Sequence, residues 1–259
     1  MLPIILEKTQ GIGKIVLNRP KVFNSFNTDM RRALLGALDD CGADPAIRCV
    51  VLTGAGGAFC AGQDLTEIKD KETAPSFEEI LDEGFNLIAL KIRQLEKPVV
   101  AAVNGVAAGA GANMALVCDI VVATESASFI QAFSKIGLIP DTGGTLTLPR
   151  LIGFAKASAF MMLGDKVSAR EAETMGMIYK CYDDDLFENN VLILSKMLSE
   201  MPTQALALIK QALNQSVFKD FEGQLATETL MQGQAAATED YKEGVLSFIE
   251  KRKPNFKGL

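Results

Sequence analysis

The amino-acid sequence predicts an α/β fold, because strands that are apolar throughout alternate with helices along the first two thirds of the chain. Glycine-rich turns follow two of these strands, at Gly54 and Gly105, and we interpret them as traces of a repeated ββα unit. From Leu186 on, the chain shows little strand pattern and contains consecutive amphipathic helices. We therefore expect a core over residues 1–195 and a helical region over 196–259 that packs on the core or mediates self-association.

The individual elements follow from hydrophobic spacing. Two short β-branched strands, Leu2–Leu6 and Gly13–Leu17, begin the chain, and Asn27 then opens a helix as its N-cap. The elements predicted next are a strand over Arg48–Thr53, a helix over Ser76–Leu95, a strand over Pro98–Val103, a helix over Gly109–Val117 and a strand over Ile120–Ala123. After residue 142 helices predominate, with a strand at Met177–Tyr182 and helices over Leu186–Leu198, Gln204–Val217, Phe221–Gln234 and Glu239–Lys251.

The composition excludes several classes of protein. The 259 residues carry a formal net charge of -6, which disfavours binding to nucleic acid or to an anionic membrane. The longest uncharged run, between Lys97 and Asp119, is too rich in glycine, alanine and polar residues for a membrane span, and we expect no signal peptide. The 5 cysteines form no CxxC pair, so we expect a reduced, cytoplasmic protein.

The chain contains no histidine. This excludes Ser-His-Asp and Cys-His catalysis and most catalytic zinc sites, and we predict no metal site. Any acid-base chemistry must therefore use a carboxylate, lysine, tyrosine or cysteine.

Asp141 stands out as a candidate general base. It is the only carboxylate between Glu125 and Asp165, with an apolar run before it and two glycines soon after. Burial among apolar groups raises a carboxylic pKa toward neutrality, where the group can accept and return a proton. An N-cap of a helix that follows explains the same pattern, and the residues alone leave both interpretations open.

The turns at Gly54–Leu65 and Gly105–Asn113 allow three interpretations. The first, a dinucleotide site, lacks the Tyr-x-x-x-Lys that short-chain dehydrogenases carry. The second is close packing of a helix on a sheet. The third is a pair of backbone N–H donors that converge on a thioester or similar carbonyl oxygen, and two such turns in one chain favour it.

Six segments together resemble the crotonase (enoyl-CoA hydratase/isomerase) superfamily in order and spacing, across essentially the whole chain. They are Leu17–Lys21 with Asn24–Phe26, Phe59–Leu65, Ala102–Gly105, Cys118–Ile120, Gly143–Thr145 and Leu148–Arg150. The resemblance implies a spiral of ββα turns that binds acyl-CoA, followed by C-terminal helices for trimerisation. It further implies a homotrimer or homohexamer, and no cofactor besides the coenzyme A of the substrate.

The resemblance also implies roles for individual residues. The oxyanion hole would consist of the N–H groups of Ala61 and Ala110. The segment formed by Ala61, Gly62, Gln63 and Asp64 would lie along the pantetheine and adenine of CoA. Lys21 would contact a CoA phosphate.

The two water-activating glutamates of the hydratases correspond to Asn113 and Phe133, so efficient hydration is not expected. We assign both residues to the substrate site. An acid at Asp141 instead resembles the isomerase branch. Asp141 would then shuttle a proton through an enolate, for a 3-enoyl to 2-enoyl shift, for isomerisation of ring-1,2-epoxyphenylacetyl-CoA to oxepin-CoA, or for both. The alternatives are an enoyl-CoA hydratase and a non-catalytic acyl-CoA-binding relative.

Overall fold

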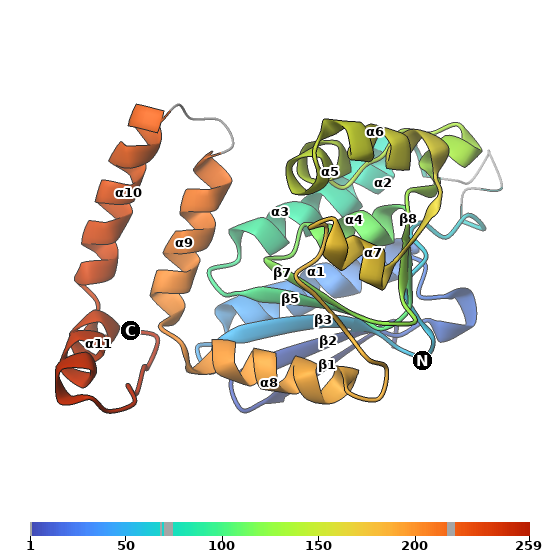
Figure 1. Cartoon of the computed structure of the whole chain (residues 1–259). Helices are drawn as coiled ribbons and strands as arrows, with labels where there is room; N and C mark the ends of the chain where they lie inside the picture. The colour runs from blue at the N-terminus through green and yellow to red at the C-terminus, as the bar shows by residue number, and fades with distance from the viewer. Residues whose placement is uncertain (1, 68, 70–74, 217–220) are drawn as a thin grey trace.

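The larger of two sheets runs through the centre of the molecule (Figure 1). The computed structural model describes residues 2–67, 69, 75–216 and 221–259. The larger sheet has the strand order β1-β2-β3-β5-β7-β10, and only the β1–β2 pair is antiparallel. Its strands are β1 (Ile4–Thr9), β2 (Ile12–Leu17), β3 (Cys49–Gly54), β5 (Val99–Val103), β7 (Ile120–Thr124) and β10 (Lys180–Tyr182).

A second sheet has the order β4-β6-β8-β9. Its strands are β4 (Ala58–Cys60), β6 (Val106–Ala108), β8 (Ser128–Ile130) and β9 (Lys166–Ser168). The chain alternates between the sheets, since β3, β5 and β7 are each followed by a strand of the smaller sheet and then by a helix. This confirms the ββα repeat inferred from the turns at Gly54 and Gly105.

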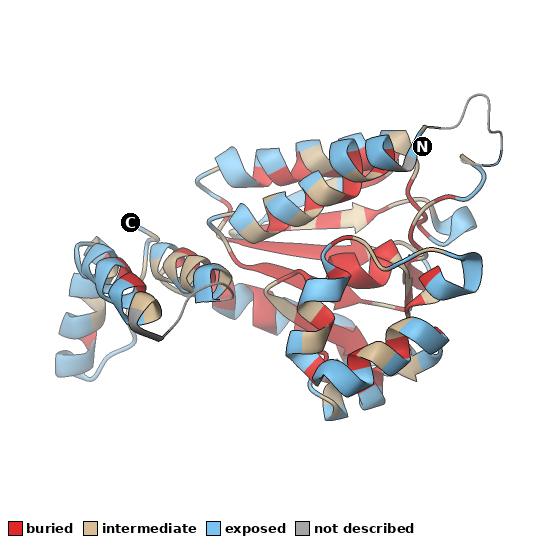
Figure 2. Ribbon diagram, turned by 90° about the horizontal axis from the view of Figure 1, so that it is seen from above, coloured by how far each residue is buried: buried red, intermediate tan, exposed pale blue. Residues whose placement is uncertain are grey.

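Helices cover both faces of the larger sheet, whose central strands are buried (Figure 2). The helix predicted from Asn27 is α1 (Thr28–Ala43), and the Asn27 side chain accepts a hydrogen bond from the Met30 N–H at 3.1 Å. Further helices of the core are α4 (Ala110–Leu116), the 3-10 segment η3 (Ala132–Ile136), α5 (Gly144–Ile152), α6 (Phe154–Leu163) and α7 (Ala169–Thr174).

The helix predicted over Ser76–Leu95 contains a π-helical turn. It consists of α2 (Phe77–Ile80), the π-helical η2 (Leu81–Phe85) and α3 (Asn86–Gln94). The Glu79 N–H donates to Ser76 Oγ and the Ser76 N–H to Glu79 Oε2, which forms a capping box. Apolar periodicity does not separate a π turn from an α turn, so the sequence did not reveal it.

The long helix α8 (Phe187–Glu200) belongs to the core. It buries Phe187, Val191, Leu194 and Leu198 in the same apolar cluster as Val51 of the larger sheet. The domain boundary predicted between residues 195 and 196 falls inside this continuous helix.

Three further helices stand apart from the sheet in Figure 1: α9 (Thr203–Ser216), α10 (Phe221–Ala236) and α11 (Glu239–Glu250). The four C-terminal helices are thus confirmed, although Val217, the last residue of one prediction, lies outside the described residues. None of the helices over the described ranges has the length and apolar character needed to cross a membrane.

Candidate active site

A mostly apolar cavity of about 150 Å³ lies between the turn after β4, the start of α4 and the α2–η2 segment. Asp141 is the only titratable side chain among the described residues that surround it. Those residues are Ala61, Gly62, Gln63, Leu65, Ile80, Leu81, Phe85, Gly109, Ala110, Ala132, Phe133, Ile136, Leu138 and Asp141.

Asp141 combines partial burial with few hydrogen-bond donors. Burial raises its pKa to about 6, although the hydrogen bond from Thr142 Oγ1 to Asp141 Oδ1, at 2.7 Å, lowers it in part. The helix-cap interpretation is wrong, because α5 begins at Gly144 with Gly143 as its N-cap and without a side-chain cap. The carboxylate is therefore a half-buried acid that lines the cavity.

Asn113 holds the main chain of Asp141. The Asn113 side chain is fully buried and its Nδ2 donates to the backbone oxygen of Asp141 at 2.9 Å. Gln131 Nε2 in turn donates to Asn113 Oδ1 at 2.7 Å. Asn113 does not line the cavity, and its side-chain amide is engaged by these two hydrogen bonds. Phe133, in contrast, forms part of the cavity wall as predicted.

In the turn after β4, the N–H of Gln63 is left unpaired among the described residues. The Phe26 N–H donates to the Gly62 oxygen at 2.7 Å, and the Asp64 N–H donates to the Phe26 oxygen at 2.9 Å. Successive peptide groups of an extended segment point in opposite directions, so the intervening Gln63 N–H points away from Phe26. It has no acceptor among the described residues.

Ala61 requires a correction, because its N–H donates to the Phe23 oxygen at 2.9 Å and is not available to a substrate. The sequence missed Gln63 as the donor of this turn. Which N–H remains free depends on the pairing with Phe26, and no pattern within the turn encodes that non-local contact.

Ala110 supplies a second unpaired donor. It is the first residue of α4, and its N–H donates to no acceptor among the described residues. The two turns come together at Gly62, which has a φ of +89°. A Cβ atom there would lie 2.9 Å from the Ala108 oxygen and 3.3 Å from the Ala110 nitrogen. Only glycine therefore allows this approach.

Asp64 and Lys21 do not reach the cavity. Asp64 is buried, forms an ion pair with Arg19 Nη2 at 2.9 Å and accepts from Thr66 Oγ1 at 2.7 Å. These contacts cap the local turn with the Asp64 carboxylate, which also accepts from the Thr66 N–H at 3.1 Å. Lys21 is exposed and lines a separate surface hollow beside Asn18.

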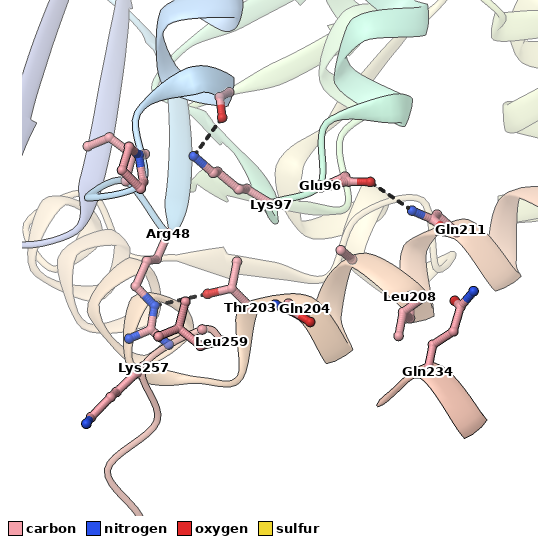
Figure 3. A pocket seen from close by; sticks show the side chains of 15 residues that line it. Arg48, Glu96, Lys97, Thr203, Gln204, Leu208, Gln211, Gln234, Lys257 and Leu259 are labelled. Carbon is pink, nitrogen blue, oxygen red and sulfur yellow. Dashed lines mark hydrogen bonds between the residues drawn. The ribbon is translucent and has the colours of Figure 1, made fainter. Parts of the chain in front are cut away.

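A larger hollow of about 480 Å³ lies between α9 and the start of β3 (Figure 3). Two of the cations that line it are already engaged: Arg48 donates to Thr203 Oγ1 at 3.0 Å, and Lys97 Nζ donates to backbone oxygens at the end of α1, including that of Cys41 at 2.7 Å. The Arg48–Thr203 contact joins the helical region to the core. The hollow therefore has the character of a structural junction.

Comparison with known proteins identifies the family. The profile described as enoyl-CoA hydratase/isomerase matches residues 7–259. The chain belongs to this family. The family's fold confirms the predicted α/β spiral, and membership implies an acyl-CoA substrate.

Relatives within the enoyl-CoA hydratase/isomerase family carry both kinds of name. The chain is 44% identical over 261 residues to the 1,2-epoxyphenylacetyl-CoA isomerase of Escherichia coli K12, with 100% of both chains covered. It is 41% identical over 252 residues to a probable enoyl-CoA hydratase of Rhodobacter capsulatus, with 97% of this chain and 96% of that one covered.

A crystal structure of an enoyl-CoA hydratase from Bacillus anthracis superposes with a TM-score of 0.90 at 32% identity, covering 99% of this chain and 100% of that one. The protein is therefore an enzyme of the hydratase/isomerase family.

Proposed function

We propose that this enzyme is an acyl-CoA isomerase in which Asp141 is the proton shuttle. The observation that carries the proposal is the position of Asp141 as the single titratable side chain among the described residues around an apolar cavity. Its raised pKa of about 6 suits a group that must both remove and return a proton near neutral pH.

The thioester carbonyl oxygen would accept hydrogen bonds from the Gln63 and Ala110 N–H groups. Each such donor stabilises a developing oxyanion by about 3 kcal/mol in a site that excludes water. The two unpaired donors and the apolar walls of the cavity support this assignment. Gly62 lies between the donors and allows their close approach.

The proposed reaction begins when the Asp141 carboxylate removes a proton from C2 of the acyl group. The electron pair of that C–H bond moves into the C1–C2 bond, and the thioester oxygen becomes an enolate oxygen held by the two N–H groups. For a 3-enoyl-CoA, the enolate then collapses, a C2–C3 double bond forms, and C4 takes the proton from Asp141. No metal or separate cofactor is required, since coenzyme A is part of the substrate.

An aromatic acyl group is the second part of the proposal. The isomerase name of the 44% identical relative supports ring-1,2-epoxyphenylacetyl-CoA, which would rearrange to the seven-membered oxepin thioester. Phe85 and Phe133 give the cavity two aromatic walls, which suit a ring.

Hydration is the second candidate function, because the 41% identical relative is named a probable enoyl-CoA hydratase. Against it, the two positions that correspond to the hydratase glutamates hold an amide engaged with the main chain, Asn113, and an apolar ring, Phe133.

The test is an assay of the purified protein with 3-hexenoyl-CoA, crotonyl-CoA and ring-1,2-epoxyphenylacetyl-CoA. We expect isomerisation of the first, the last or both, and slow hydration of crotonyl-CoA. Isomerisation of neither would contradict the proposal, and fast hydration of crotonyl-CoA would favour the hydratase.

We also propose that the enzyme is a cytoplasmic homotrimer or homohexamer that does not bind nucleic acid. Exposed apolar side chains on the two last helices support self-association, with Leu230 65% exposed, Phe248 84% and Ile249 70%. Light scattering on the purified protein measures the oligomer mass, and a monomer at micromolar concentration would contradict this part.

A further inference from the structure

A polar cluster of Arg31, Glu67 and Thr28 lies beside the Gln63 turn. The proposed reaction assigns no role to these three residues. Arg31 Nη1 donates to Gln63 Oε1 at 2.7 Å and forms an ion pair with Glu67 Oε2 at 3.2 Å. Gln63 Nε2 donates to the same Glu67 oxygen at 2.9 Å. The other Glu67 oxygen accepts from the N–H and the hydroxyl of Thr28, both at 2.7 Å. The two hydrogen-bonding atoms of the Gln63 amide are thus both held by this ion pair.

The cluster also contacts the opposite wall of the cavity. The Arg31 guanidinium carbon lies 5.9 Å from the centre of the Phe85 ring, which lines the cavity. Gly84 in the π turn packs on the same arginine, because a Cβ there would lie only 2.4 Å from Arg31 Cδ. Arg31 therefore contacts two residues that line the cavity, Gln63 and Phe85.

Stability alone does not explain a buried ion pair at this place. The Arg31 side chain is 5% exposed and that of Glu67 19%. Replacing such a pair with well-packed apolar residues is often neutral or stabilising, because desolvation of the charges offsets their attraction. Burial raises the pKa of Glu67, but hydrogen bonds from Thr28 and Gln63 outweigh this and hold the pKa below its ordinary value. Glu67 is therefore ionised at the pH where Asp141 acts.

We infer that Arg31 and Glu67 are positioning residues, which hold the Gln63 peptide so that its N–H points at the thioester oxygen. This inference rests on the proposed function. The side chain of Gln63 is fixed on one side of the turn by the ion pair, and the main chain is fixed by Phe26. Together these contacts fix the direction in which the free N–H of Gln63 points.

The test compares Glu67→Gln with the wild type. The new amide has one oxygen, so it cannot serve Thr28 and the Arg31–Gln63 pair together. We expect kcat to fall at least about tenfold while KM changes less than about threefold, because a misplaced donor weakens the transition state more than binding. The matched control is Glu173→Gln, which breaks a surface ion pair with Lys180 of 2.7 Å and should change neither constant.

A spectroscopic probe separates this inference from the proposed function. A conjugated aryl-acyl-CoA that is not turned over absorbs further to the red when its carbonyl oxygen is polarised by hydrogen bonds. We expect a red shift on binding to the wild type and to Glu173→Gln, and a smaller shift at equal affinity in Glu67→Gln. Gln63→Met keeps the main-chain N–H but loses the amide contacts, so it should show the same smaller shift. If Glu67→Gln does not fold, the shift of Gln63→Met tests the inference in its place.

A wild type that leaves the probe unshifted would contradict the oxyanion hole and the inference with it. A shifted wild type with equal shift and equal kcat in the folded variants would contradict the inference alone.

Discussion

Asp141 must be ionised to remove a proton, and this fixes the pH dependence of the enzyme. Because burial raises the pKa of Asp141 to about 6, kcat/KM for isomerisation should rise as pH increases through about 6 and level off above it. Steady-state rates between about pH 5 and about pH 8 measure this profile. A profile with no change over that range would contradict the role of Asp141 or its burial.

The same shift predicts a cost in stability. The folded-state pKa lies above the ordinary value of 3.8, so the folded state holds the Asp141 proton more tightly than the unfolded state. The free energy of unfolding therefore falls by up to about 3 kcal/mol as pH rises from about 4 to about 6. Above about pH 6 it stays at this lower value. Asp141→Asn should thus be more stable than the wild type at about pH 8 and nearly equal at about pH 4, by urea denaturation. Greater stability of the wild type at the higher pH would refute this.

At the residue scale, the sequence identified Asp141 as a candidate base, and the structure places this side chain at an apolar cavity. Asp141 could be found because a lone acid in an apolar run, in a chain without histidine, leaves few other bases. The free donor at Gln63 could not, since it depends on a contact with Phe26 from a distant segment. The ion pair of Asp64 depends in the same way on a distant segment, because its partner Arg19 lies 45 residues away in the chain.

At the scale of the elements, Asn113 joins α4 to the segment before α5. Asn113→Ala removes the hydrogen bond to the Asp141 oxygen and leaves the Nε2 of buried Gln131 without its acceptor. We expect a loss of about 1–3 kcal/mol in the free energy of unfolding. A fall of about tenfold in kcat should accompany it, because the base is then less firmly placed.

Denaturation and kinetics on the same preparation check both effects of Asn113→Ala. Asn190→Ala, which removes an exposed contact within α8, is the control. Full activity of Asn113→Ala would show that Asp141 is held without it.

The elements themselves differ in how far sequence predicts them. Long amphipathic helices such as α1 and α8 and the apolar strands of the larger sheet were predicted within a few residues. The strands of the smaller sheet were missed because each has 3 residues, too few to show an alternating pattern. The ββα repeat was nevertheless recognised from its glycine turns.

For the whole molecule, a buried ion pair connects the helical region to the core. Lys210 of α9 binds Asp119 at 2.8 Å, with side-chain exposures of 5% and 17%, and Asp119 also pairs with Arg93. Asp119→Ala leaves the buried ammonium without its partner and should cost about 3 kcal/mol or more. Thermal unfolding measures this loss of stability. The control is Asp40→Ala, which breaks an exposed ion pair with Lys8 and should have a small effect. Equal stability of the two variants would contradict this role.

The direct test of the whole account is the kinetics of Asp141→Asn. The amide keeps the size of the side chain and cannot accept a proton from C2, so acyl-CoA should still bind with nearly unchanged affinity. We predict that isomerase turnover falls at least about a hundredfold. Near-normal isomerase turnover in this variant would remove Asp141 from the chemistry and contradict the proposed function.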